Sequence, residues 1–497
     1  MIGACSKKND VTSSDDTSTS TETSNGTSAI SDTGITSGTA EGSSEKGENT
    51  DDLIENSTFS STVAINFGTS TTITNPLSAA GVTITQNGND ITVTSSATGV
   101  EFLLSGTTTN GSIKIYSEKK FKTTLNGVNI TNDDGPAINI QSGKRNFMVI
   151  NANTTNSLTD GTSYATSTED QKGTIFSEGQ MVFTGTGTLN IKSNYKHGIV
   201  SDDYVRIISG NITVSSAASD GIHANDAIII DGGTINLTAS ADGIQAEEGH
   251  IIINDGTINV TAVEDGITAS YDGTDTSILP YVHINGGTIT VKSTKGEGIE
   301  SKSILTINKG TVVTNTYDDG LNAATAIYIN GGLIYSNATN NDAMDSNGTF
   351  TITGGIVIAA GAGAPEAGID CDAKTLKITG GLVVGIGGAT SGPTASVTTV
   401  RALVMGSGSA NNIVHIESAD GTEALTFMAP KSFSTLLFAS AKLKASTTYN
   451  IYTGGSVSNG TTFNGLYLTG TYNKGTKGSA FTTTSVVTQI GGSISRG

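Results

Sequence analysis

Apolar and polar positions repeat along the middle of the chain with a period of 22 to 23 residues in most steps. The segment DGIHANDAIIIDGGTINL (220–237) returns as DGIQAEEGHIIINDGTINV (242–260), so that Ile222 recurs as Ile244. A repeat of this length with strand-like composition indicates a solenoid. The first apolar anchor falls at Ile199, Ile222, Ile244, Ile267, Ile299, Leu321, Met344 and Ile369.

Two further anchors recur in each period, beginning at Ile207 and Ile212, so each period holds three short strands and three turns. Alternation within each strand directs one set of side chains inward. Ile, Val and Thr suit the strands, while Asp-Gly and Gly-Gly pairs suit the turns. Stacked periods therefore predict an all-β fold: a parallel β-helix with three strands per coil of about 22 residues. Parallel crossovers favour the right-handed form.

Composition narrows the classes of partner. The 497 residues include 45 acidic and 26 basic side chains, a formal net charge of −19. Nucleic-acid binding needs a basic surface, so we expect no nucleic-acid partner. The negative charge also argues against binding of an acidic polymer, unless a cation bridges the polymer and the protein. The sequence has no run of 18 apolar residues, which excludes the usual signature of a transmembrane helix.

The limits of the repeat predict three segments. Residues 1–57 are Ser, Thr, Asp, Glu, Gly and Asn with almost no apolar residues, so we expect a disordered tether. Residues 58–392 form the β-helix, and residues 393–497 form a β-rich C-terminal cap over its exposed strands.

The start of the chain, Ile2-Gly3-Ala4-Cys5-Ser6, looks like a bacterial lipobox with Cys5 as the lipidated residue. The basic and apolar regions of a signal peptide are missing upstream, so an accidental match is the alternative. The tether-like segment that follows favours a lipoprotein. We therefore expect an outer-membrane-anchored protein at the cell surface, which contacts the membrane only through its lipid.

Acidic residues recur at fixed places in the coils and concentrate in the later ones. Stacking places equivalent residues about 4.8 Å apart, so acids of successive coils form vertical files. Calcium takes roughly six to eight oxygen ligands, including carboxylates and Asn carbonyls. The candidate metal ligands are Glu297, Asp318, Asp319, Asp342, Asp345, Asp370 and Asp372. Two other interpretations stay open: a solvated acidic face, or acids that accept backbone N–H groups at their own turns.

Candidate saccharide ligands lie near these acids in the sequence. Sugar rings stack on aromatic side chains while polar groups fix their orientation. Trp is absent, and the candidates are Tyr271, Tyr281, Tyr317, Asn322 and Glu300. Tyr271 and Tyr281 bracket an insertion at 270–280, which either lines a binding surface or is a harmless bulge. The five His residues fall in different files, so we expect no zinc site.

Four stretches in a fixed order resemble one protein family. They are LNGVNI (125–130), NSLTDG (156–161), the DGI and GGTI coils, and YNIYTGG (449–455). The match covers about residues 58–490 and is similar to the bacterial extracellular carbohydrate-binding β-helix family, whose members look like polysaccharide lyases but are treated as binding proteins. The resemblance implies a right-handed β-helix, bound calcium, and affinity for plant-type polysaccharides, including acidic ones.

We therefore predict a monomeric protein that binds polysaccharide, whether acidic and pectin-like or cellulose, through a calcium-containing face of the β-helix. A calcium-dependent polysaccharide lyase is one alternative, and it would need a Lys or Arg base beside the metal. Lys302 lies two residues from Glu300, which would keep it protonated, so we assign no catalytic residue. A structural adhesin or stalk without glycan binding is the second alternative.

Overall fold

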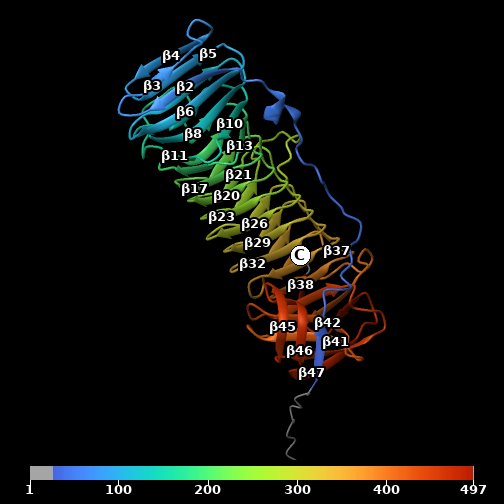
Figure 1. Cartoon of the computed structure of the whole chain (residues 1–497). Coiled ribbons are helices and arrows are strands. Elements are labelled where there is room, and N and C mark those ends of the chain that lie inside the picture. The colour runs from blue at the N-terminus through green and yellow to red at the C-terminus, as the bar shows by residue number, and fades with distance from the viewer. Residues whose placement is uncertain (1–25, 496–497) are drawn as a thin grey trace, which may run out of the picture.

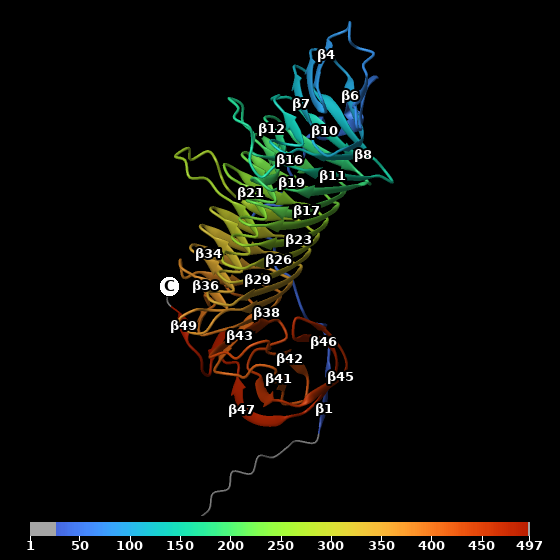
Figure 2. The same ribbon diagram turned by 90° about the vertical axis from the view of Figure 1, so that its left-hand side faces the viewer.

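The computed structural model describes residues 26–495 and confirms the parallel β-helix. Coils stack along one long axis, from the N-terminal coils to a separate group of strands at the C-terminal end (Figures 1 and 2). Cys5, the predicted lipidation site, lies outside the described residues. Within the described residues, no helix has the length and apolar character needed to cross a membrane.

Each coil contributes one strand to each of three files. The first file forms a 13-stranded sheet of β4 (Val82–Asn87), β5 (Asp90–Ser95), β7 (Ser112–Ser117), β9 (Ile138–Ile140), β12 (Gly173–Ser177), β15 (His197–Ser201), β18 (Ile222–Ala224), β21 (Ile244–Ala246), β24 (Ile267–Ala269), β27 (Ile299–Ser301), β30 (Leu321–Ala323), β33 (Met344–Ser346) and β36 (Ile369–Cys371). We call it the first sheet.

The other two files carry the second and third strands of each coil. The second file is β10 (Asn146–Ile150), β13 (Met181–Gly185), β16 (Tyr204–Ile207), β19 (Ala227–Ile230), β22 (His250–Ile253), β25 (Val282–Ile284), β28 (Ile304–Ile307), β31 (Ala326–Ile329), β34 (Thr349–Ile352) and β37 (Leu376–Ile378). The third file is β11 (Thr155–Thr159), β14 (Thr188–Lys192), β17 (Asn211–Ala217), β20 (Thr234–Ala239), β23 (Thr257–Ala262), β26 (Thr288–Ser293), β29 (Thr311–Thr316), β32 (Leu333–Ala338), β35 (Ile356–Ala360) and β38 (Leu382–Gly387).

The register of the first sheet follows the sequence repeat. Ile222 of β18 pairs directly with Ile244 of β21, and Ile244 pairs with Ile267 of β24. All three side chains are fully buried in one continuous apolar core. Because each anchor covers the anchor of the coil before it, burial of these side chains holds successive coils in line.

The glycine of each Asp-Gly-Ile turn is required by the close approach of the next coil. A Cβ atom on Gly243 would lie 2.5 Å from the carbonyl oxygen of Gly266, and one on Gly266 would lie 2.6 Å from that of Gly298. Contacts this short exclude any larger residue unless the coils separate. The glycine of the Asp-Gly-Ile motif is therefore required by the close spacing of the coils as well as by the turn.

Both ends of the solenoid are covered by less regular strands. The N-terminal coils use β2 (Ser61–Phe67), β3 (Thr72–Thr74), β6 (Val100–Thr108) and β8 (Phe121–Thr131). The C-terminal strands are β39 (Thr390–Ser391), β40 (Arg401–Met405), β41 (Ile413–Ser418), β42 (Glu423–Met428), β43 (Thr435–Ser440), β44 (Thr448–Thr453), β45 (Ser456–Phe463), β46 (Leu466–Asn473), β47 (Thr476–Thr482), β48 (Val487–Gln489) and β49 (Ile494–Ser495). Strand β43 pairs antiparallel with β38, so it occupies the last edge of the third file.

Residues 26–57 are not the disordered tether that their composition predicts. Strand β1 (Thr27–Ile30) pairs antiparallel with β46 in the C-terminal sheet. The chain then runs back along the outside of the solenoid to the short 3-10 helices η1 (Thr50–Asp52) and η2 (Ile54–Asn56) near the N-terminal coils (Figure 1). We call residues 31–57 the strap.

The strap is held largely by hydrogen bonds and ion pairs, although Ile35 also packs against a buried apolar cluster. Its polar composition is misleading for this reason. Four asparagines that follow second-file strands donate to strap carbonyl groups, each at 2.7 to 2.9 Å. They are Asn254, Asn285, Asn308 and Asn330. Each also donates to the side chain in the coil before it, so the four amides form a continuous ladder.

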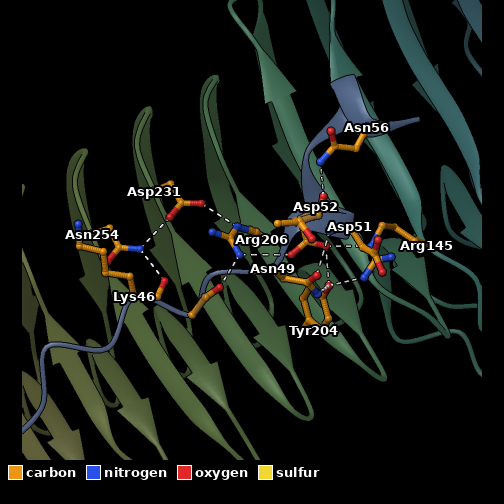
Figure 3. Close-up of polar contacts among 12 residues, drawn as sticks. Lys46, Asn49, Asp51, Asp52, Asn56, Arg145, Tyr204, Arg206, Asp231 and Asn254 are labelled. Carbon is orange, nitrogen blue, oxygen red and sulfur yellow. Dashed lines mark hydrogen bonds and ion pairs between the residues drawn. The ribbon is translucent and has the colours of Figure 1, made fainter. Parts of the chain in front are cut away.

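The strap ends in a buried ion-pair cluster (Figure 3). Asp52 is completely buried, and its carboxylate accepts from Arg145 Nε at 2.8 Å, from the Tyr204 hydroxyl at 2.6 Å and from Arg206 Nη1 at 3.3 Å. Arg206 also pairs with Asp231 at 2.7 Å. This carboxylate is therefore satisfied from two coils at once, and it fixes the strap to both.

Candidate functional site

The outer face of the first sheet carries most of the predicted site residues. In several coils the turn before the strand supplies a carboxylate that reaches the following coil. Asp220 Oδ1 accepts the backbone N–H of Asp242 at 3.1 Å, and Asp242 Oδ1 accepts that of Asp265 at 2.8 Å. Asp319 Oδ1 accepts the N–H of Asp342 at 3.0 Å in the same way. One interpretation predicted that the acids accept backbone N–H groups at their own turns. These three accept from the next coil, whereas Asp318 accepts the N–H of Asp319 in its own turn at 3.1 Å.

Acids of the later coils converge on the same face. Asp345 of β33 is the register partner of Asp370 of β36. Asp342, in the turn before β33, joins them, and one carboxylate oxygen of each residue lies within 4.8 Å of the others. Calcium bonds oxygen at about 2.3–2.6 Å, so two ligands of one ion can lie up to about 5 Å apart. The three carboxylates therefore fit a single calcium ion. We call them the acid triad.

A second group of carboxylates lies one and two coils earlier in the same file. Asn322 of β30 donates to Glu297 Oε1 at 3.0 Å and to Asp319 Oδ2 at 3.2 Å. Glu297 Oε2 is buried and has no hydrogen-bond partner. Glu300 of β27 accepts from Thr268 at 2.8 Å and pairs with Lys302. The predicted ligands Glu297, Asp319, Asn322 and Glu300 are thus one connected cluster.

Burial distinguishes this cluster from a merely solvated acidic face. Asp319 is 4% exposed and Glu300 is 5% exposed. Burial raises the pKa of Glu297 to about 9, and the charges of Glu300 and Asp265 add to this shift. Burial and the charge of Asp345 raise the pKa of Asp319 to about 8. These carboxyl groups hold protons at neutral pH unless a cation compensates their charge.

Two members of the acid triad also have raised pKa values. Burial raises the pKa of Asp342 to about 7, with a contribution from the charge of Asp370. Burial and the charges of Asp370 and Asp372 raise the pKa of Asp345 to about 6. Asp370 is anchored by the Ser391 and Ser495 hydroxyls, each at 2.8 Å.

The last two predicted metal ligands flank these groups. Asp318 Oδ1 accepts from Asn341 Nδ2 at 2.7 Å, and its charge contributes to the raised pKa of Asp319. Asp372 is exposed and acts on Asp345 in the same way. The structure therefore gathers all seven predicted ligands on one face. We call these seven residues with Glu300 the acidic file.

The three predicted tyrosines do not share one location. Tyr317 is 48% exposed and directly precedes Asp318, so it is available to a ligand at the acidic file. Tyr271 folds into its own loop, where its hydroxyl accepts from the N–H of Asp275 at 3.1 Å. This loop follows β24 and projects from the solenoid (Figure 2).

Tyr281 is placed with the strap, which corrects its assignment to the glycan site. Its ring stacks on His250 at 4.6 Å and on His283 at 4.2 Å between ring centroids. Its hydroxyl lies 3.3 Å from the Glu45 carboxylate of the strap. The side chain therefore serves the packing of the second file, because the ordered strap occupies that surface.

Earlier on the first sheet lies a cleft of about 490 Å³ that the sequence does not predict. The cleft is lined by Lys172, Lys196, His197, Ser219, Asp220, His223, Ala241, Asp242, Gln245, Glu247 and Glu264. The expected scatter of the His residues is wrong for two of them, because the rings of His197 and His223 stack at 4.5 Å. We call this region the histidine cleft. The signal that could have found it is the stacking of His197 over Asp220, with His223 three residues further along the chain.

Burial lowers the pKa of His197, whereas the pKa of His223 is raised. Burial opposes the charged form of His223, but its hydrogen bond to Asp220 and the charges of Asp220 and Glu247 raise its pKa. Burial likewise opposes ionisation of Asp220, yet hydrogen bonds from both rings hold the pKa of this carboxyl well below its usual range. Asp220 is therefore the ionised centre of the cluster.

A stacked aromatic pair includes Tyr195, which directly precedes two residues that line the histidine cleft. Tyr195 is 44% exposed, and its ring stacks on that of Tyr164 at 4.1 Å. Buried Asp160 fixes this arrangement by accepting from the Tyr164 hydroxyl at 2.7 Å and from Ser193 at 3.0 Å. Since Tyr195 directly precedes Lys196 and His197, a sugar ring stacked on it would reach the polar cleft.

Comparison with known proteins gives one family and one fold neighbour. A family described as "Carbohydrate-binding domain-containing protein" matches residues 87–364 and 282–461, and the first match alone spans more than half of the chain. No curated protein matches. A solved polysaccharide lyase-like protein from C. thermocellum, in a gadolinium derivative, is 22% identical, with 59% of this chain and 96% of that chain covered and a TM-score of 0.40.

Proposed function

Because the chain belongs to the family of carbohydrate-binding domain-containing proteins, we propose that it binds an acidic polysaccharide through calcium held by the acidic file. The observation on which this depends is the acid triad, whose three carboxylate oxygens lie within 4.8 Å of one another. Three protein oxygens leave several of the roughly six to eight calcium positions open. Carboxylate and hydroxyl oxygens of a glycan are suitable ligands for those positions.

Charge explains why a cation is needed. The protein carries a formal net charge of −19, so an acidic polymer is repelled by the protein as a whole. Calcium at Asp342, Asp345 and Asp370 would offset most of the local negative charge and would favour the ionised forms of Asp342 and Asp345, whose pKa values are raised. Exposed Tyr317, next to Asp318, supplies an apolar surface for a sugar ring beside the ion.

Binding is favoured over cleavage by the state of Lys302. A lyase needs a base beside the metal to remove a proton next to a carboxylate. Burial opposes the charged form of Lys302, but its hydrogen bond to Glu300 and the charges of Glu300 and Glu297 raise its pKa. A lysine held protonated in this way cannot accept the proton.

We also propose attachment to the cell surface through a lipid on Cys5. The described chain begins beside β46, because β1 pairs with that strand. An anchor at Cys5 would therefore connect to the folded chain at the C-terminal sheet. Metabolic labelling with palmitate tests this, because the label should be incorporated into the full-length chain and lost in Cys5→Ala.

A pull-down on polygalacturonate and on cellulose, with calcium or with EDTA, tests the binding proposal. We expect retention on polygalacturonate in calcium, and loss of retention in EDTA and in the double variant Asp345→Asn, Asp370→Asn. Asp255→Asn, an exposed acid in a turn between the second and third files, is the matched control and should bind normally. No retention on either polymer would overturn the binding proposal, and retention unaffected by EDTA would overturn the role of calcium. Formation of an unsaturated, ultraviolet-absorbing product would identify a lyase instead.

A further inference from the structure

Three buried side chains in the histidine cleft present their ligand atoms to one point. His197 Nδ1 lies 2.9 Å from Asp220 Oδ2, and His223 Nδ1 lies 3.0 Å from the same oxygen. The exposed fractions of His197, His223 and Asp220 are 4%, 5% and 3%. Two imidazole nitrogens and one carboxylate oxygen at this separation are a ligand set for a borderline divalent metal ion, with bonds of about 2.0–2.2 Å.

The stacking of coils creates this arrangement. Ile199 of β15 pairs with Ile222 of β18, which places His197 over Asp220 in the neighbouring coil. His223 follows Ile222 on the strand, and its ring turns back over Asp220 to stack on His197. The cluster thus rests on strand register and is held by two coils, not by a mobile loop.

Neighbouring groups hold two of these side chains in the orientation that a metal ligand requires. His223 Nε2 lies 3.1 Å from Glu247 Oε2, so this nitrogen donates its proton to a carboxylate and leaves Nδ1 free to bind a metal. Asp220 uses its other oxygen, Oδ1, to accept the backbone N–H of Asp242 at 3.1 Å. In zinc sites, the imidazole that binds the metal usually donates its second N–H to a carboxylate, and this carboxylate fixes the orientation of the ring.

The cluster is also accessible. It lines the cleft of about 490 Å³, together with the side chains of Lys172, Lys196 and Gln245. Gln245 Oε1 lies 2.9 Å from His223 Nδ1, close enough to act as a further oxygen ligand. A site with three protein ligands beside an open cleft keeps a coordination position for water or a ligand oxygen.

We propose that His197, Asp220 and His223 bind one divalent transition-metal ion of the zinc class, with its open position facing the histidine cleft. This site differs from the acidic file in its chemistry. Nitrogen ligands select zinc, cobalt or nickel, whereas the oxygen ligands of the acidic file suit calcium. The alternative occupant of the same geometry is a pair of protons, with both rings donating to Asp220 as a structural hydrogen-bond cluster.

Cobalt absorbance distinguishes the two. Metal-free full-length protein is titrated with Co²⁺ in excess Ca²⁺, which occupies the carboxylate-only sites. We expect a visible absorption band typical of nitrogen-ligated Co²⁺, which saturates at one equivalent per chain and is displaced by Zn²⁺. The band should be lost in His197→Gln and in His223→Gln, and it should persist in His250→Gln, which alters a histidine of the second file.

Variants of the supporting carboxylate give a second test in a protein whose ligands are intact. Glu247→Gln should weaken Co²⁺ binding about 10- to 100-fold, the usual effect of removing a carboxylate behind a ligating histidine. Glu248→Gln, at the neighbouring exposed position, should have no effect. Circular dichroism confirms that each variant is folded. Absence of a saturable band, or a band that survives both His197→Gln and His223→Gln, would overturn the proposal and assign the cluster to hydrogen bonding alone.

Discussion

Asp345 and Asp370 are direct register partners on neighbouring parallel strands. Equivalent positions on such strands lie about 4.8 Å apart, where two carboxylate charges repel each other by roughly 1 kcal/mol in water and roughly 3–4 kcal/mol at an effective dielectric constant of 20. Asp342 adds a third carboxylate within 4.8 Å. The fold therefore brings together charges that need either protons or a cation.

Calcium should stabilise the protein through these residues. If the acid triad binds calcium, the ion raises the free energy of unfolding by about 2.7 kcal/mol at a concentration 100 times the dissociation constant. Asp345→Asn removes one charged ligand, so the calcium-dependent rise in the thermal midpoint should largely disappear. Asp255→Asn should keep the rise. Equal stabilisation of Asp345→Asn and the parent protein would contradict this assignment.

Stability in EDTA should fall as pH rises. In the folded protein the pKa of Asp319 is raised to about 8 and that of Asp342 to about 7, from ordinary values near 3.8. Between about pH 4 and pH 8 the folded state therefore holds protons that the unfolded state has released. The free energy of unfolding decreases with pH across this window, by about 1.4 kcal/mol per pH unit for each proton.

Thermal midpoints at pH 5 and pH 8 measure this effect, with Asp319→Asn as the comparison because it should flatten the decline. Calcium requires deprotonated ligands, so the gain on adding calcium should be larger at pH 8 than at pH 5. A midpoint in EDTA that declines equally in the parent protein and in Asp319→Asn would show that Asp319 does not titrate in this range.

The strap should detach when its buried carboxylate is removed. Asp52→Ala removes the buried carboxylate that Arg145 and Arg206 share, although Arg206 keeps Asp231. Breaking a buried ion pair of this kind costs about 3–5 kcal/mol. Hydrogen exchange of the Glu41 amide, which donates to Asn330 Oδ1 at 2.9 Å, reports the opening of the strap. We expect faster exchange there in Asp52→Ala. Asp51→Ala changes the exposed neighbour and should leave the exchange rate near that of the parent protein.

Two glycines should respond to alanine in opposite directions. A Cβ atom on Gly266 would lie 2.1 Å from Val291 Cγ1, so Gly266→Ala should lower the free energy of unfolding by about 1–3 kcal/mol, as overpacking does. Gly143 has no atom within 4 Å of the corresponding position and no positive φ. Gly143→Ala should raise the stability by about 0.4–1 kcal/mol. Chemical denaturation of both variants measures the difference.

Two of the predicted tyrosines should differ in glycan binding. Tyr317 is exposed beside the acidic file, whereas the Tyr281 ring is stacked on His250 and His283. Tyr317→Ala should weaken polygalacturonate binding by about 0.5–1.5 kcal/mol, the range of an aromatic stacking contact. Tyr281→Ala should leave the affinity unchanged, and titration calorimetry in calcium compares the two. Equal losses would mean that Tyr317 makes no particular contact with the sugar.

The sequence predicted the solenoid and its register because a fixed period repeats the same buried anchor. Ile222 and Ile244 are paired as expected, and from that register the approach of Asp342, Asp345 and Asp370 follows. The strap was missed because most of the contacts that hold it on the solenoid are polar. The recurring Asn254 and Asn285 were visible in the sequence, but nothing indicated which carbonyl groups they would contact.

The histidine cleft was missed for a different reason. Assigning each residue to a vertical file treats the files as separate, yet His223 reaches Asp220 three residues earlier on its own coil. Contacts between neighbouring files depend on side-chain rotamers, which the repeat does not determine. Tyr281 was assigned to the glycan site because it borders the insertion at 270–280. Its position in the sequence does not show on which side of the coil its ring lies.

A crystal structure with calcium and an oligogalacturonide bound tests the central claim most directly. The account predicts anomalous density for one calcium ion between Asp342, Asp345 and Asp370, with a saccharide carboxylate among its ligands and a sugar ring near Tyr317. An oligosaccharide bound on another face, or an acid triad without an ion in saturating calcium, would contradict it.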